Sequence, residues 1–92
     1  MRHFSWDPEK NEKLKTERHV SFEDIIDSME HGFLLETVDH PNTEKYPHQR
    51  MFVVQIKDYV YLVPFVENEG VTFLKTIVPS RKATKKYIEE KE

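Results

Sequence analysis

Four apolar segments rich in β-branched and aromatic residues follow one another through the later part of this 92-residue chain. Such segments are typical of β-strands, and polar turn residues separate them. The last two connections, Lys57-Asp58 and residues 67–70, are too short for the crossover that parallel neighbours need. The segments are therefore predicted to pair as an antiparallel meander. The predicted strands are 33–38, 50–56, 59–66 and 71–78.

Two helices are predicted ahead of these strands. Asp7 suits the N-cap of the first helix and Pro8 its first position, and the helix is expected to run to about Glu17. Ser21 opens the second helix, with a carboxylate three residues later that approaches a capping box. Apolar residues then repeat at spacings of three and four, and Gly32 can end the helix. These apolar residues are Phe22, Ile25, Ile26 and Met29.

A third helix is predicted after Ser80, which suits an N-cap, and Ala83 and Tyr87 can then face the sheet. The predicted fold class is α+β: two N-terminal helices, a four-stranded antiparallel meander and a C-terminal helix, with the helices on one face. Pro64 interrupts the third strand and lacks an N–H, so an edge, a bulge or a frayed end is expected there. Residues 1–92 are expected to form one domain with a modest core.

Composition excludes several kinds of site. The chain has no cysteine, so it forms no disulfide and no thiolate metal site. The five histidines show no pair at ligand spacing with a third partner, and two glycines are too few for a Gly-rich phosphate loop. No cofactor and no metal is therefore predicted. No apolar run approaches the roughly 20 residues that span a bilayer, and the N-terminus lacks the apolar core of a secretory signal, so a cytoplasmic location without membrane contact is expected.

Charge is distributed unevenly, although the net charge is only −3. Residues 21–49 carry seven carboxylates and one lysine, whereas residues 81–92 carry five Lys and Arg against three Glu. The overall balance argues against strong nonspecific binding of polyanions. It still allows a local basic patch near the C-terminus and an acidic face that a basic partner could cover.

The segment 79–86, Pro-Ser-Arg-Lys-Ala-Thr-Lys-Lys, opens the predicted last helix. Arg81 and Lys82 fall in its first turn, where the helix dipole repels cations by roughly 0.3–1 kcal/mol each. Basic side chains beside exposed backbone N–H groups make a natural anion site. A charged, solvated final helix is the alternative interpretation.

Three short motifs stand along the chain: Trp-Asp-Pro-Glu-Lys-Asn at 6–11, Arg-His-Val-Ser-Phe-Glu-Asp at 18–24 and Pro-Ser-Arg-Lys-Ala-Thr at 79–84. Together with Arg50 at the start of the second strand, they resemble the BrnT family of bacterial toxins. The resemblance covers nearly the whole chain and implies a RelE-like fold and a metal-independent endoribonuclease that inhibits translation. It also implies an RNA substrate, neutralisation by a cognate BrnA-type antitoxin, and contact with operator DNA only through the antitoxin complex.

Metal-free RNA cleavage requires a base for the 2′-OH, stabilisation of the pentacoordinate phosphate and protonation of the leaving oxygen. Arginine suits the phosphate because its planar fork matches phosphate oxygens. Arg50 and Arg81 are the candidates, with Lys82 as a further phosphate contact. Arg50 starts one strand and Arg81 follows another, so the meander is expected to bring them to one end of the sheet. For Arg50 alone, a structural ion pair is the alternative.

His19 and His48 are the candidates for acid and base, since imidazole titrates near neutral pH. His19 lies in a family-like motif, and its alternative role is to fix the loop between the two helices. His48 lies in the loop just before Arg50, where an ordinary surface role is the alternative. Glu36 and Asp39 border the first strand and can act as a base or orient an arginine.

Two functions remain open at this stage. The basic set of Arg50, Arg81 and Lys82 favours the ribonuclease toxin. The acidic balance and the lack of a decisive base favour a non-catalytic, toxin-like module that binds an antitoxin or serves as a subunit of a repressor complex.

Overall fold

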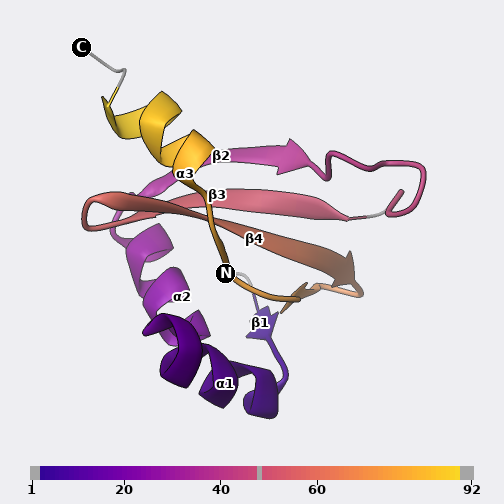
Figure 1. Ribbon diagram of the computed structural model, residues 1–92. Coiled ribbons are helices and arrows are strands. Elements are labelled where there is room, and N and C mark those ends of the chain that lie inside the picture. Colours follow the sequence, from indigo (N-terminus) through magenta and orange to yellow (C-terminus); the bar gives the residue numbers. More distant parts are fainter. Residues whose placement is uncertain (1–2, 48, 90–92) are drawn as a thin grey trace.

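The computed structural model describes residues 3–47 and 49–89, and Figure 1 shows its sheet and helices. Near the N-terminus are helices α1 (Pro8–Arg18) and α2 (Phe22–Glu30), close to their predicted positions. The last described residues form one α-helical turn, α3 (Arg81–Thr84), followed by the π-helical turn η1 (Lys85–Glu89). The strands are β1 (His3–Ser5), β2 (Leu34–Asp39), β3 (Arg50–Ile56), β4 (Tyr59–Asn68), β5 (Val71–Leu74) and β6 (Val78–Pro79).

The mixed α+β class is confirmed, but the sheet has six strands rather than the predicted four. Its order is β1-β5-β4-β3-β2, with β6 also paired to β4. The pairs β2–β3, β3–β4 and β4–β5 are antiparallel, whereas β1 lies parallel to β5 with His3 opposite Val71. Strand β1 was missed because three residues show no periodicity, and their partner lies far along the sequence.

The predicted strand 71–78 is interrupted at residues 75–77, which divide it into β5 and β6. The Lys75 N–H donates to the Pro64 carbonyl at 2.8 Å, but Pro64 has no N–H to return the bond. Because a strand residue directs its N–H and C=O towards the same neighbour, the ladder between the two strands stops at this proline. Pro64 therefore lies in a central strand, at the point where its neighbour leaves the sheet.

One face of the sheet packs against α1 and α2. Phe22 is fully buried and stacks on Trp6, with ring centroids 5.8 Å apart. Phe52 and Phe65 stack on adjacent strands at 3.9 Å, beneath the helices. This apolar layer is the main core of the molecule. Its buried members are Leu14, Val20, Phe22, Ile25, Phe52, Val54, Val63, Phe65, Leu74 and Ile77.

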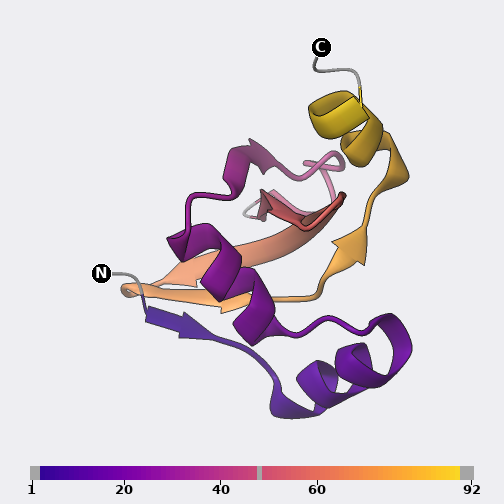
Figure 2. The same cartoon turned by 90° about the vertical axis from the view of Figure 1, so that its left-hand side faces the viewer.

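Helix α3 covers the other face of the sheet, so the prediction that all helices pack on one face is wrong. Val53 and Leu62 are paired neighbours that alternate with the core residues, so they point away from α2. They line a groove together with Ala83 and Tyr87 of the C-terminal helical segment. In Figure 2, α1 lies at the bottom and α3 at the top.

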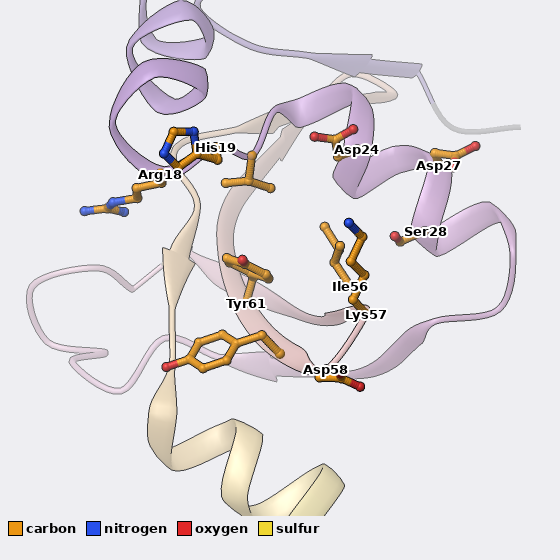
Figure 3. A pocket seen from close by; sticks show the side chains of 11 residues that line it. Arg18, His19, Asp24, Asp27, Ser28, Ile56, Lys57, Asp58 and Tyr61 are labelled. Atoms are coloured by element: carbon orange, nitrogen blue, oxygen red, sulfur yellow. The ribbon is translucent and has the colours of Figure 1, made fainter.

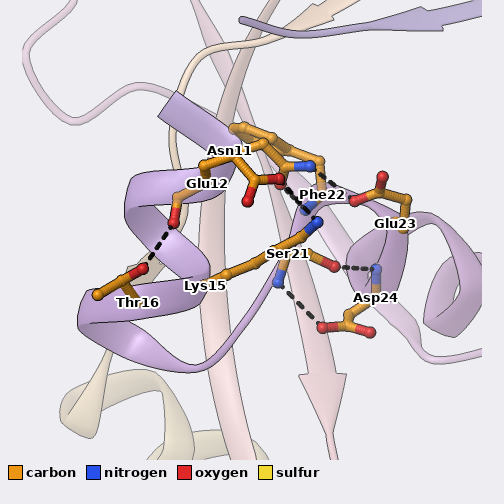
Figure 4. A network of polar contacts seen from close by, with 8 residues as sticks. All are labelled: Asn11, Glu12, Lys15, Thr16, Ser21, Phe22, Glu23 and Asp24. Atoms are coloured by element: carbon orange, nitrogen blue, oxygen red, sulfur yellow. Dashed lines mark hydrogen bonds and ion pairs between the residues drawn. The ribbon is translucent and has the colours of Figure 1, made fainter. Parts of the chain in front are cut away.

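Helices α1 and α2 are locked together by the side chain of Asn11, which is 3% exposed (Figure 4). Its Oδ1 accepts from the Phe22 N–H at 2.8 Å, and its Nδ2 donates to Glu23 Oε1 at 2.7 Å. That second bond holds the pKa of Glu23 below its usual value. Ser21 and Asp24 complete a capping box at the start of α2. These residues of the two N-terminal motifs are therefore structural.

Candidate functional site

An open cleft of about 510 Å³ lies between the end of α1, helix α2 and the hairpin that joins β3 to β4 (Figure 3). Its walls combine a histidine, two cations, two tyrosines and three aspartates. The lining residues are Arg18, His19, Val20, Asp24, Asp27, Ser28, Ile56, Lys57, Asp58, Tyr59 and Tyr61.

His19 and Lys57 stand in the cleft wall with left-handed backbone conformations, at φ 58° and φ 55°. His19 is the C-cap of α1, and Lys57 lies in the two-residue turn of the β3–β4 hairpin. A non-glycine residue with positive φ is uncommon and strained, and such strain often marks a functional site. Glu69 is the one other such residue in the described chain, and it lies in the turn before β5.

Arg18 holds one wall of the cleft in place. Its guanidinium donates to the carbonyl oxygen of Ile77, in the segment between β5 and β6. Ile77 is fully buried, so this bond ties the end of α1 to the interrupted strand. Arg18 therefore positions its neighbour His19 at the mouth of the cleft.

The α2 wall of the cleft is acidic, but its carboxylates have partners. Asp24 accepts from the Ser21 N–H at 3.0 Å, and Asp27 Oδ1 lies 3.5 Å from His31 Nδ1. The Asp27 carbonyl and carboxylate raise the pKa of His31 above its usual value. In Figure 3 the Lys57 side chain extends towards α2, so the cation of the hairpin faces the acidic wall.

Arg50 and Arg81 lie at opposite ends of the sheet, so the structure does not bring them together as expected. Arg50 is paired in register with Phe65 near the end of β4. Arg81 follows Ser80, whose N–H donates to the Val60 carbonyl near the start of β4. Five residues of an extended strand span about 17 Å.

The expectation failed because β3 and the β5–β6 segment both run antiparallel to β4 and therefore run in the same direction. The start of one and the end of the other then lie at opposite edges of the sheet. Arg50 instead has an exposed ion pair, with its Nε 3.5 Å from Asp39 Oδ1. This is the structural alternative considered for Arg50, and Asp39 orients it.

The remaining predicted site residues divide between the two faces of the sheet. His19 lines the cleft, whereas Lys82 lines the groove beneath α3 on the opposite face. Glu36 accepts a hydrogen bond from the Tyr87 hydroxyl. His48 lies outside the described residues.

Sequence reasoning missed Lys57, and for Tyr59 and Tyr61 it favoured a packed core over an exposed platform for bases, whereas all three residues line the cleft. The hairpin turn was predicted, but only the fold shows that α1 ends opposite it. The two tyrosine rings pack edge to face, with centroids 5.7 Å apart. The sequence feature that could have indicated this part of the cleft is the pair of alternating tyrosines that directly follows a turn containing a lysine.

Within residues 3–47 and 49–89, no group of three or more His, Cys, Asp or Glu side chains is placed to hold a metal ion. None of the described helices combines the length and apolarity that crossing a membrane requires.

The fold and cleft define a small α+β domain whose open site offers proton-transfer, cationic and aromatic side chains. The family model described as "Ribonuclease toxin, BrnT, of type II toxin-antitoxin system" matches residues 6–86. The chain therefore belongs to the BrnT family, which confirms the resemblance found in its motifs. The family implies ribonuclease activity, RNA targets and an antitoxin partner. Comparison with curated proteins and with solved structures found no match.

Proposed function

We propose that this protein is a metal-independent endoribonuclease toxin of RelE-like fold, that it inhibits translation, and that a BrnA-type antitoxin neutralises it. RNA is cut in the cleft beside His19. The observation that carries this proposal is the placement of His19, in a strained left-handed conformation, at the mouth of a cleft that also holds Lys57 and two tyrosines. Imidazole is the side chain best suited to transfer protons at neutral pH.

The reaction is an attack of the ribose 2′-oxygen on the adjacent phosphorus. The P–O5′ bond breaks, and the products are a 2′,3′-cyclic phosphate and a free 5′-hydroxyl. His19 takes the 2′-OH proton and then, as imidazolium, delivers it to the departing 5′-oxygen, while Lys57 balances the charge that develops on the phosphate. Because these steps need only side chains, the proposal assigns no role to a metal.

Arg81 follows β6 near the start of β4, at the end of the sheet where the cleft tyrosines lie, and we assign it a second phosphate contact. Ser80, the residue before it, donates its N–H to the Val60 carbonyl, and Val60 lies between Tyr59 and Tyr61 of the cleft wall. The tyrosine rings offer stacking surfaces for bases, each worth about 1–3 kcal/mol.

His19→Asn tests the catalytic role with little disturbance of the backbone, because asparagine tolerates the left-handed conformation. Cleavage of single-stranded RNA in the presence of EDTA is expected to fall by about 10²–10⁴-fold, while the urea midpoint stays within error. His3→Asn, in the exposed edge strand β1, is the matched control and is expected to cut like the wild type. Wild-type cleavage by His19→Asn would refute the role of His19. Loss of wild-type cleavage in EDTA would refute metal independence.

Arg81→Ala is expected to slow cleavage and relieve growth arrest, whereas Arg50→Ala is expected to cut RNA within a factor of two of the wild type. The reason is that Arg50 lies about 17 Å of strand away from the cleft side of β4. Single-turnover rates of the two variants measure this contrast directly. Equal losses in both variants would show that the cut phosphate lies elsewhere on the sheet.

The non-catalytic module is favoured by one specific observation, the three aspartates in the cleft wall. Under that function, expression without the antitoxin leaves growth unchanged, and the purified wild type binds its antitoxin but cuts no RNA. Growth arrest by the wild type, relieved by His19→Asn, excludes it.

A further inference from the structure

A second hollow, of about 420 Å³, lies on the face of the sheet opposite the cleft. Its floor is formed by Val53 and Leu62 of the sheet, and Val38 and Pro41 form one side. The other side is the C-terminal helical segment, with Ser80, Lys82, Ala83, Lys86 and Tyr87. We call this hollow the α3 groove.

The α3 groove stays open because little side-chain volume stands over its floor. Helix α3 is a single α-helical turn, and the residue it places over Val53 and Leu62 is the small Ala83. Of the two floor residues, Val53 is 2% exposed and Leu62 is only half-buried, so Leu62 supplies the open apolar surface. Apolar surface that a domain leaves open in a concave site is a common mark of an interaction surface.

The rim of the α3 groove is cationic. Residues 81–86 contain Arg81, Lys82, Lys85 and Lys86 and no carboxylate, and Lys82 and Lys86 line the groove itself. The Glu36 carboxylate of β2 already accepts a hydrogen bond from the Tyr87 hydroxyl, which raises the pKa of Tyr87. An occupant that matches this groove has carboxylates flanking apolar side chains.

RNA fits the α3 groove less well than an acidic peptide does. Bases bind single-stranded sites by stacking on aromatic rings, and Tyr87 is the one aromatic residue among the described residues that line this groove. Its hydroxyl is already bonded to Glu36. The floor is aliphatic, which suits the apolar side chains of a protein segment.

We propose that the α3 groove is the docking site for an acidic, amphipathic segment of the antitoxin. Apolar side chains of that segment fill the space over Val53 and Leu62, and its carboxylates pair with Lys82 and Lys86. The identity of the partner rests on the toxin function. Lys82, expected from the sequence to contact RNA, thereby recognises the antitoxin.

The test is binding of the purified cognate antitoxin to the full chain, measured by calorimetry at low and high salt. Lys82→Glu/Lys86→Glu is expected to raise Kd by at least tenfold and to flatten the salt dependence. Lys10→Glu/Lys13→Glu on α1 reverses the same number of charges and is expected to leave Kd within a factor of two. Leu62→Ser, which removes apolar floor without changing charge, is expected to raise Kd by at least fivefold.

Chemical-shift mapping locates the contact independently of these variants. Amide signals of Val53, Leu62 and Ala83 are expected to shift on addition of antitoxin more than those of Val20 and Asp58 in the cleft. Unchanged Kd in the Lys82→Glu/Lys86→Glu variant, or shifts confined to the cleft, would overturn the proposal. So would a charge reversal that abolishes RNA binding while antitoxin binding stays intact, since the groove would then be an RNA site.

RNA cleavage by the wild type is measured in parallel, so that the two proposals fail separately. If the protein binds antitoxin through the α3 groove but cuts no RNA, the docking proposal stands and the ribonuclease proposal is refuted. If the protein cuts RNA with His19 and binds antitoxin at another surface, the ribonuclease proposal stands and the docking proposal is refuted.

Discussion

The two faces of the sheet are built from similar residues but are covered very differently. On the face of α1 and α2, Phe22, Ile25 and Phe52 are fully buried in the main core, and the cleft lies beside that core. On the face of α3, one helical turn stands over Val53 and Leu62 and leaves an open groove. The first face therefore supplies most of the stability, whereas the second leaves Leu62 partly exposed in a groove.

The polar side chains on the two faces also differ in what they contact. At the α1–α2 corner, Asn11 and Ser21 are bonded to backbone N–H groups and hold the helices in place. In the C-terminal helical segment, Lys82 of α3 and Lys86 of η1 line the groove instead. Sequence motifs of similar appearance can thus be used for packing at one end of the chain and carry exposed charge at the other.

Removal of a fully buried aromatic ring from the core is expected to have the greatest effect. Phe22→Ala should destabilise the protein by about 3–5 kcal/mol, because the ring is fully buried and stacked on Trp6. Leu62→Ala, in the groove, removes a half-buried side chain and is expected to cost clearly less. Urea denaturation of both variants measures the contrast. Equal losses of unfolding free energy in the two variants would show that the two faces of the sheet contribute equally to stability.

Loss of the Asn11 hydrogen bonds between α1 and α2 is expected to have the second-largest effect on stability. Asn11→Ala leaves the Phe22 N–H buried without its acceptor, which should cost about 1–3 kcal/mol. Asn11→Asp keeps an acceptor for that N–H but loses the donor to Glu23 and brings two carboxylates together. It should therefore remain destabilised and become more stable as pH falls and the carboxylates are protonated. A pH-independent loss in Asn11→Asp would contradict this account.

On the α3 face, Thr84 plays the part that Asn11 plays at α1 and α2: it is 4% exposed, and its hydroxyl holds α3 against β4. Its hydroxyl accepts from the Val60 N–H and donates to the Ser80 carbonyl, both at 2.8 Å. Thr84→Val keeps the shape but removes both bonds, and is expected to cost about 1–2 kcal/mol. Because these bonds fix α3 over the groove, antitoxin binding should weaken as well. Thr84→Ser retains the hydroxyl and is expected to recover most of both losses.

Local signals in the sequence predicted the helix caps and the antiparallel neighbours. Asp7, Ser21 and Ser80 cap helices as expected, because capping depends on contacts within a few residues. Strand β1 and the break at residues 75–77 were missed, since both depend on pairings with distant parts of the chain. The side of the sheet that α3 covers was equally a long-range property.

The candidate site was predictable only in part. His19 was named from its motif, but its cleft is completed by Lys57 and Tyr61 from a hairpin that is remote in sequence. The pairing of Arg50 with Arg81 failed because strand direction, which residue spacing alone does not reveal, places them at opposite edges. Residue type thus suggested candidates, and topology decided which of them can act together.

The smallest expected effect is a pH dependence confined to the α1–α2 face. His31 ends α2, its Nδ1 bonds the Asp27 carbonyl at 2.8 Å, and its pKa is raised by that bond and by the Asp27 charge. A raised pKa means that the folded state favours the protonated ring, so this stabilisation is complete below the unfolded value of 6.5 and is lost as pH rises through the folded value. His31→Gln should therefore lower the urea midpoint slightly at pH 5 and leave it unchanged at pH 8.

Tyr87 on the α3 face also has a raised pKa, but from an ordinary value of 10.0, so its contribution is lost only in alkali. Tyr87→Phe should consequently shift the midpoint equally at pH 5 and pH 8, and a pH-dependent shift in that variant would show that the two faces are coupled.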